Sequence, residues 1–272
     1  MGRYNFDKIV DRKHTKSLKY DFAVQRGKPA DVLPFWVADM DFEIPSELKQ
    51  VLLDRVNHGI FGYTESDDAY FNVLKEWFGN RFNWNIDKKW LVKTPGVVFA
   101  LAMAVRAFTK EGEGVLINQP VYYPFSMVID DNNRNLINVP LIQGEDKYTI
   151  DFEGVERAII EHNVTLFLLC NPHNPVGRVW TEDELKRLGD ICIKHNVIII
   201  SDEIHADFVW DGHKHTVFAD LGESYAEHCI VCTAPSKSFN IAGLQVSNIF
   251  IPNDSLRRRF IKEIDRAGYS QL

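Results

Sequence analysis

The sequence predicts a three-layer α/β fold, in which helices cover both faces of a mostly parallel central sheet. The chain has 272 residues, of which 45% are hydrophobic, and this is enough to bury a large core. Short apolar runs alternate along it with segments of helical periodicity. Several of these runs are apolar without interruption, which is typical of parallel strands buried on both faces. Strands that alternate with helices favour a parallel sheet between two helical layers.

The individual elements follow from these patterns in chain order. Gly96 opens a helical segment that we expect to span 96–109. Thr181 and Glu184 have the spacing of a capping box at the start of a helix over 181–195. The other expected elements are helices over 122–130 and 152–162, and strands over 114–118, 136–140, 165–170, 197–201, 230–233 and 247–251.

The charge and composition of the chain exclude several classes of protein. A formal net charge of −7 and the lack of a long basic stripe argue against a nucleic-acid partner. No apolar run is long enough to span a bilayer, and the N-terminus carries no apolar signal segment. We therefore expect a soluble cytoplasmic protein without a membrane partner.

The cysteines and histidines do not form a metal-binding pattern, and we expect no metal. Cys229 and Cys232 have the spacing of a redox or zinc pair, but they lie inside an apolar run, and no second such pair completes a zinc site. We therefore expect them to be buried and structural. His213 and His215 follow a turn signal without a third ligand, and we expect both in an exposed loop.

Polar residues follow three of the expected buried strands, at the carboxyl ends where ligands bind in parallel sheets. The first strand is followed by the run 171–177, the second by Asp202 and His205, and the third by Ser236 and Lys237. A lysine among small residues at a strand end is placed for a partly desolvated amine, which can attack an aldehyde to form a Schiff base. An ordinary loop lysine would be the default explanation of Lys237 if it stood alone.

Three motifs stand at these strand ends in order: N-P-H-N-P-V-G from residue 171, S-D-E-I-H from residue 201 and S-K-S-F-N-I-A-G-L from residue 236. Together they resemble the fold-type I aminotransferase superfamily, whose members depend on pyridoxal 5′-phosphate (PLP). The segments W-V-A-D-M-D-F (36–42), F-G-Y-T (61–64) and D-E-I-H resemble, more narrowly, its MalY/PatB branch of cystathionine β-lyases. The resemblance extends over nearly the whole chain.

The resemblance implies a PLP site with defined roles. Lys237 would hold the cofactor as a Schiff base, and Asp202 would lie beside the ring nitrogen and keep it protonated. Asn174 would hydrogen-bond the 3′-oxygen of the ring. His205 would lie close to the ring or to the 3′-oxygen, although a core histidine with satisfied hydrogen bonds is an alternative.

The phosphate of the cofactor needs donors, which the resemblance places at the start of the helix over 96–109. Gly96 lets the backbone approach closely, and Val97 and Val98 would donate through their main-chain N–H groups. Ser236 would add a hydroxyl to the phosphate. This site carries less positive charge than is usual in the broader superfamily.

The resemblance also assigns aromatic and substrate contacts. Tyr122 would stack on the cofactor ring, with its neighbour Tyr123 as an alternative. Tyr63 would reach the phosphate of a neighbouring subunit, which implies a homodimer. Trp36 and Ala38 belong to a loop that would close over the amino-acid substrate and bind its carboxylate through main-chain groups.

The expected domain organisation has two parts. Residues 1–45 would form an N-terminal arm with the substrate loop, and residues 46–272 the PLP-binding large domain, which ends in a helix leading to a small domain. The C-terminal small domain, with the arginine that pairs with the substrate carboxylate, is expected to be largely missing. Poor substrate affinity and exposed apolar surface would follow.

The resemblance implies a carbon–sulfur β-lyase of the cystathionine β-lyase type, acting on a thioether amino acid or on cysteine. The products would be a thiol, pyruvate and ammonia. A PLP-dependent aminotransferase is the alternative, since shared fold and cofactor do not fix the reaction. A third possibility is a shortened protein of this fold that binds a cofactor or partner without turnover.

Overall fold

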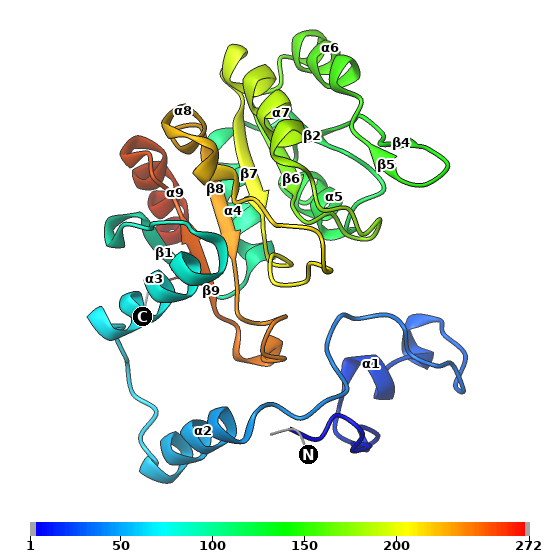
Figure 1. The fold of residues 1–272 in the computed structure, drawn as a ribbon, viewed down its shortest axis with the longest axis vertical. Helices are drawn as coiled ribbons and strands as arrows, with labels where there is room; N and C mark the ends of the chain where they lie inside the picture. Colours follow the sequence, from blue (N-terminus) through cyan, green and yellow to red (C-terminus); the bar gives the residue numbers. More distant parts are fainter. Residues whose placement is uncertain (1–3, 270–272) are drawn as a thin grey trace. The chain divides into compact units, whose positions relative to one another are not determined.

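A computed structural model of the protein describes residues 4–269 (Figure 1). The chain divides into two compact units. The N-terminal unit consists of Met1–Gly62 and Pro235–Leu244, and the sheet unit of Tyr63–Ala234 and Gln245–Leu272. The domain boundary expected after residue 45 stays a prediction.

The sheet unit is built on a sheet of seven strands within the described residues, in the order β1-β9-β8-β7-β6-β2-β3 (Figure 1). Neighbours among β3, β2, β6, β7 and β8 pair in parallel, whereas β9 runs antiparallel to both β8 and β1. The mostly parallel sheet expected from the sequence is thus confirmed. The strands are β1 (Leu91–Thr94), β2 (Gly114–Ile117), β3 (Asn135–Asn138), β6 (Leu166–Cys170), β7 (Ile198–Asp202), β8 (Cys229–Thr233) and β9 (Ser247–Phe250), and a separate hairpin pairs β4 (Ile142–Gln143) with β5 (Tyr148–Thr149).

Helices cover both faces of the sheet and complete the three layers. The helices of this unit are α3 (Asp68–Phe82), α4 (Val97–Phe108), α5 (Pro124–Asp130), α6 (Phe152–His162), α7 (Glu182–Lys194), α8 (Glu223–Ala226) and α9 (Asp254–Arg266). Short 3₁₀ turns lie at Lys88–Trp90 and Phe218–Leu221. No helix in the described part of the chain combines the length and the apolarity needed to cross a bilayer.

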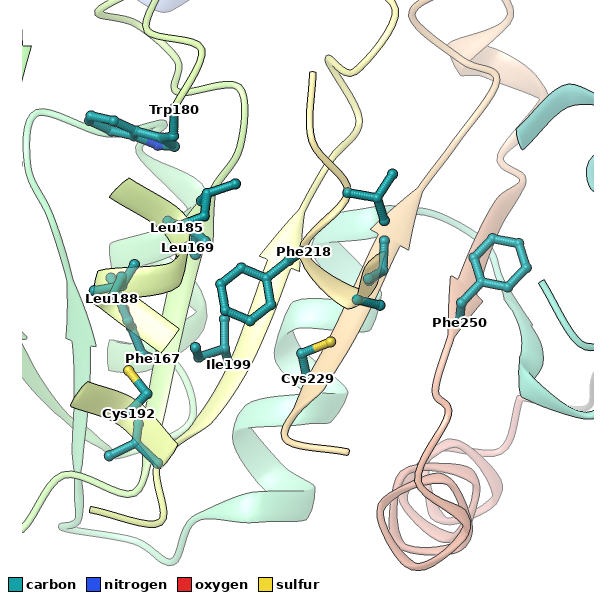
Figure 2. Packing of buried hydrophobic residues seen from close by; sticks show 14 of the residues in the cluster. Phe167, Leu169, Trp180, Leu185, Leu188, Cys192, Ile199, Phe218, Cys229 and Phe250 are labelled. Carbon is teal, nitrogen blue, oxygen red and sulfur yellow. The ribbon is translucent and has the colours of Figure 1, made fainter. Parts of the chain in front are cut away.

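Strand β6 shows how the layers form. Its residues are buried along the whole strand and point alternately to opposite faces of the sheet. Leu166 belongs to the core under α4, α5 and α9, whereas Phe167 belongs to the core that α7 closes with Leu185 and Leu188 (Figure 2). A strand with a core on both faces needs apolar side chains at every position, which explains the uninterrupted apolar run in the sequence.

Local sequence signals place the ends of these elements. Thr181 and Glu184 form the expected capping box, so the prediction for the start of α7 is confirmed. Helix α5 begins at Pro124 rather than at residue 122, because Tyr123 takes the cap position and proline is suited to the first helical turn.

The expectation that His215 is exposed is wrong, whereas the expected burial of Cys229 and Cys232 is confirmed. His213 is exposed, but His215 is buried and its Nε2 lies 2.8 Å from Oε2 of Glu203, in a pair where both side chains are almost fully covered. The hydrogen-bonded carboxylate makes burial of the imidazole possible, and this pairing is not visible in the sequence. All four cysteines are free and buried, as expected for Cys229 and Cys232.

The N-terminal unit contains helices α1 (Leu18–Asp21) and α2 (Ser46–His58), with 3₁₀ turns at Val24–Arg26 and Ala242–Leu244. The segment 36–42 has no helix or strand. It is tied to the loop 235–244 by Asn240, whose side chain accepts from the backbone N–H of Met40 and donates to the carbonyls of Met40 and Phe42.

Candidate active site

Asp202 is the last residue of β7 and lies at the centre of the carboxyl edge of the sheet. Its backbone is in register with Cys170 on β6 and with Cys232 on β8. The residue is only 5% exposed. Its Oδ1 accepts a hydrogen bond from the backbone N–H of Ile204 at 3.1 Å, which fixes the carboxylate at the strand end. The fold therefore presents a buried carboxyl group where ligands bind in sheets of this kind.

Asn174 lies in the turn that follows β6, next to the Asp202 strand. The backbone N–H of Asn171 donates to the carbonyl of Asp202 at 2.9 Å, and that of Asn174 donates to Sγ of Cys170 at 3.4 Å. The turn is closed by a bond from the N–H of His173 to the carbonyl of Arg178 at 2.7 Å. Asn174 and Asp202 are thus held on neighbouring strand ends.

Tyr122 follows β2, the strand on the other side of β6. Burial raises the pKa of Tyr122, and the charges of Tyr123 and Asp202 act in the same direction, which places the phenol within the field of that carboxylate. The Tyr123 ring packs edge-on against it, with centroids 5.3 Å apart, and is the more exposed of the two. The sheet unit therefore brings Tyr122, Asn174 and Asp202 together along one edge.

His173 connects two of these turns and was not singled out from the sequence. Its Nε2 donates to the carbonyl of Pro120 at 3.0 Å, in the turn that leads to Tyr122, while its backbone belongs to the turn that carries Asn174. Burial lowers the pKa of His173 to about 4, against a weaker opposite effect of the hydrogen bond to Pro120. A histidine between two Asn-Pro pairs was the available signal in the sequence.

We expect His173 to make the protein less stable in acid. The pKa of His173 in the folded state, about 4, lies below the ordinary value of 6.5. In the pH window between these two values, the unfolded chain therefore binds a proton that the folded chain does not. The free energy of unfolding should fall as the pH is lowered through the window, by about 3 kcal/mol in total. Denaturant titrations at several pH values should show a flatter profile for His173→Gln than for the exposed control His213→Gln. Equal profiles for both variants would contradict this assignment.

The start of α4 supplies unpaired backbone donors at the same carboxyl edge of the sheet. Gly96 is the cap residue, no side chain caps the helix, and the first N–H groups of an α-helix have no partner within it. A Cβ added to Gly96 would meet no atom within 4 Å, so the space beside this backbone is open. Thr94 and Ser247, whose hydroxyl oxygens are 2.7 Å apart, fix the preceding turn to β9.

Lys237 lies in the N-terminal unit, on the loop that leaves β8. Its Nζ donates to the carbonyl of Ala38 at 3.1 Å. The structure thus brings together Lys237 and Ala38, which were predicted separately as the Schiff-base lysine and as a substrate-loop residue. Trp36, in the same segment, donates from Nε1 to the carbonyl of Lys19 at 3.1 Å. Ser236 is partly buried, and its carbonyl accepts from the N–H of Ile241.

The predicted cofactor contacts of His205 and Tyr63 stay predictions. His205 is partly buried in the turn after β7, where its carbonyl accepts from the N–H of Phe208. Tyr63 is 93% exposed. Within residues 4–269, no group of three or more histidine, cysteine or acidic side chains is arranged to hold a metal ion.

Comparison with known proteins identifies the family. The family model for aminotransferase class I and II matches residues 30–271. The chain belongs to the aminotransferase class I and II family. The family uses PLP, and the resemblance seen in the motifs is confirmed.

The relatives place the chain in one branch of this family. It is 44% identical to cystathionine beta-lyase PatB of Bacillus subtilis, over 98% of this chain and 69% of PatB. It is 34% identical to protein MalY of Escherichia coli, over 96% of this chain and 66% of MalY. The chain therefore belongs to the MalY/PatB branch and spans about two thirds of the length of these relatives.

A solved structure confirms the fold. Cystalysin from Treponema denticola, which contains a PLP cofactor, superposes with a TM-score of 0.92 at 43% identity, over 97% of this chain and 67% of cystalysin. The three-layer α/β architecture of the fold-type I major domain, expected from the sequence, is thus observed.

Proposed function

We propose that this chain is a PLP-dependent carbon–sulfur β-lyase that acts on a thioether amino acid or on cysteine. One observation carries the proposal: a buried carboxylate, Asp202, stands at the centre of the sheet edge in a chain that is 44% identical to a cystathionine β-lyase. A carboxylate at this position can stabilise a protonated pyridine nitrogen, because an opposite charge nearby favours the protonated form of the ring.

The residues of the sheet unit fit PLP in charge and in space. Asp202 suits the protonated ring nitrogen, the Asn174 amide suits the 3′-oxygen, and Tyr122 offers an aromatic face. The open space beside Gly96, at the free N–H groups of Val97 and Val98, suits a phosphate. When bound, PLP supplies an electron sink for the breaking of bonds at the substrate Cα.

Lys237 carries the chemistry that the protein itself provides. Its Nζ would hold PLP through a covalent bond and would become free once the amine of the substrate has replaced it. The released Nζ then takes the proton from the substrate Cα as a general base. The β-thiolate would leave and take up a proton to give a thiol, and water would hydrolyse the remaining three-carbon product to pyruvate and ammonia. His205 beside the ring and the Ser236 hydroxyl at the phosphate complete the proposed cofactor contacts.

The N-terminal unit supplies the proposed substrate contacts, and a second subunit supplies one further contact to the cofactor. Main-chain groups of the segment that contains Trp36 and Ala38 bind the substrate carboxylate. Tyr63, which is almost fully exposed, donates its hydroxyl to the phosphate held by the other subunit of a homodimer. The substrate side chain is a thioether or thiol, because the reaction requires a sulfur leaving group at Cβ.

Addition of PLP and a substrate tests the proposal. The protein with PLP should develop the visible absorbance of a lysine-bound cofactor, and with cystathionine or cysteine it should release pyruvate. Transfer of the amino group to a keto acid without pyruvate release would instead identify an aminotransferase, the activity for which the family is named. Absorbance without either reaction would mean that the chain binds PLP without turnover.

Gly96→Ala should weaken PLP binding without weakening the fold. Gly96 has φ 171° and an added Cβ has no neighbour within 4 Å, so the backbone accepts alanine in the absence of ligand. In the complex the methyl group would occupy space that the phosphate needs, at a cost of about 1–3 kcal/mol in binding. Equilibrium titration with PLP and thermal unfolding measure both quantities. Gly79→Ala, which also meets no atom within 4 Å, is the matched control, and equal PLP affinities for the two variants would contradict the phosphate assignment.

A further inference from the structure

The segment 36–42 of the N-terminal unit has a conformation that its own sequence does not favour. Val37 has φ 56°, in the left-handed region, which is unusual for a β-branched residue and costs about 1–3 kcal/mol. The N–H of Asp39 donates back to the carbonyl of Val37 at 2.9 Å and tightens the bend. Contacts from outside the segment must therefore hold it in place.

Three consecutive carbonyls of this segment each accept a hydrogen bond from a cationic side chain. The carbonyl of Ala38 accepts from Lys237 Nζ at 3.1 Å. The next carbonyl, of Asp39, accepts from Lys19 Nζ at 3.1 Å. The carbonyl of Met40 accepts from Nη1 of Arg12 at 3.2 Å. The orientation of the carbonyl that holds the Lys237 amine is thus coupled to the two cations beside it.

Two carboxylates of the same segment fix these cations. Arg12 Nη2 lies 2.6 Å from Oδ2 of Asp39, and Arg12 Nη1 lies 2.7 Å from Oδ1 of Asp41. Lys19 Nζ lies 3.0 Å from Oδ2 of Asp41. The side chains of Arg12 and Asp39 are 18% and 25% exposed, so water screens this pair less than it screens a surface pair, whereas Asp41 is 46% exposed.

The surroundings of Arg12 and Asp41 favour the charged form of both side chains. The hydrogen bond from Arg12 to Asp39 raises the pKa of the guanidinium, although burial opposes this effect. Burial disfavours the charged form of Asp41, but hydrogen bonds from Arg12, Lys19 and Tyr20 outweigh it and lower the pKa of the carboxyl group. The ion pair between Arg12 and Asp41 is therefore favoured by the surroundings of both groups.

We propose that Arg12 and Lys19 are positioning residues for the Schiff-base lysine. By binding Asp39, Asp41 and the adjacent carbonyls, they hold the Ala38 carbonyl where it keeps the Lys237 amine in place. This inference rests on the proposed function, since it assigns to the cluster an effect on the reactivity of that amine.

The test separates cofactor binding from reaction at Lys237. In the covalent step, the Lys237 amine condenses with the PLP aldehyde, a C=N bond forms and water leaves. Its rate is followed by absorbance in the cofactor-free protein, and the attachment site is confirmed by borohydride reduction and peptide mapping. Pyridoxine 5′-phosphate has an alcohol in place of the aldehyde, so its dissociation constant reports on binding without this step.

Arg12→Met should slow the covalent attachment of PLP about tenfold, because it removes the charge-assisted hydrogen bonds from Arg12 to Asp39 and Asp41. The dissociation constant of pyridoxine 5′-phosphate should stay unchanged. Arg12→Lys should restore part of the rate. Lys8→Met, which breaks the exposed Lys8–Glu43 pair of the same unit, is the matched control and should behave as the unsubstituted protein. If Arg12→Met does not fold, Asp39→Asn weakens the same pair from the acceptor side and replaces it.

Two outcomes overturn the inference alone. The first is an attachment rate in Arg12→Met equal to that of the unsubstituted protein. The second is an equal loss of rate and of pyridoxine 5′-phosphate affinity, because the cluster would then act on the cofactor pocket and not on the amine. If the unsubstituted protein never attaches PLP to Lys237, the proposed function fails and the inference fails with it.

Discussion

Lys237→Ala should abolish covalent attachment of PLP and reduce β-elimination by about 10³–10⁴-fold, because a general base alone contributes roughly 10²–10⁴-fold and this lysine is also the covalent anchor. The substitution removes the donor to the Ala38 carbonyl but none of the core residues of the sheet unit. The fold should therefore persist. Absorbance after PLP addition, borohydride trapping and pyruvate release are the measurements.

A control variant and a control ligand show whether the effect of Lys237→Ala is specific to this lysine. Lys214→Ala removes an exposed lysine of the sheet unit and should leave attachment and elimination unchanged. Pyridoxine 5′-phosphate should still bind to Lys237→Ala, because its proposed contacts are Asp202, Asn174, Tyr122 and the start of α4. Retained trapping of PLP at another lysine, together with full activity, would show that Lys237 is not the anchor.

Asp202→Asn should reduce β-elimination by about 10²–10³-fold while PLP remains bound. The neutral amide can still accept the hydrogen bond from the N–H of Ile204, so the local turn is preserved. It cannot stabilise a positive ring nitrogen, and loss of one partner of a buried ion pair costs about 3–5 kcal/mol. The decrease should appear in kcat, because the protonated ring matters most when negative charge develops during the reaction. Steady-state kinetics of pyruvate release measures it.

Glu203→Gln is the control for Asp202, since the two carboxylates are adjacent and both are buried. Glu203 accepts from Ser201, from His215 and from the N–H of Phe218, all within the core beneath the sheet edge. Its replacement should lower the free energy of unfolding by about 1–3 kcal/mol and leave kcat nearly unchanged. If Glu203→Gln reduced kcat as much as Asp202→Asn, the ring-nitrogen role could not be assigned to Asp202.

The sequence was sufficient to predict six of the seven strands of the sheet, all except β1 (Leu91–Thr94), and the position of Asp202 and Asn174 at strand ends. Strands such as β6 and β7 are buried on both faces and must be apolar throughout, so they stand out without any knowledge of the fold. Parallel pairing then brings their carboxyl ends to one edge, which is why Asp202 and Asn174 could be placed there. Lys237 follows the third such strand, and its position among small residues marked it as unusual.

Only the tertiary structure revealed the partners of these residues. His215 was expected in an exposed loop, yet it is buried, and its Nε2 lies 2.8 Å from Oε2 of Glu203, 12 residues earlier in the chain. Arg12 and Lys19 carried no signal at all, since a cation far from any motif is most often a solvated surface residue. Their importance comes from contacts with Asp39 and Asp41, which are 20 or more residues away in the chain.

The difference between what the sequence predicts and what only the folded chain reveals has a physical cause. Burial, helix caps and strand ends depend on neighbouring residues, so the sequence alone determined the α/β layers, the carboxyl edge and the presence of Lys237, Asp202 and Asn174 near strand ends. Charge pairs and hydrogen bonds between distant segments depend on distances that only the folded chain defines. The tertiary structure therefore decided that the Lys237 amine donates to the Ala38 carbonyl, that Arg12 and Lys19 bind the neighbouring carbonyls, and that His173 connects the turns that carry Tyr122 and Asn174.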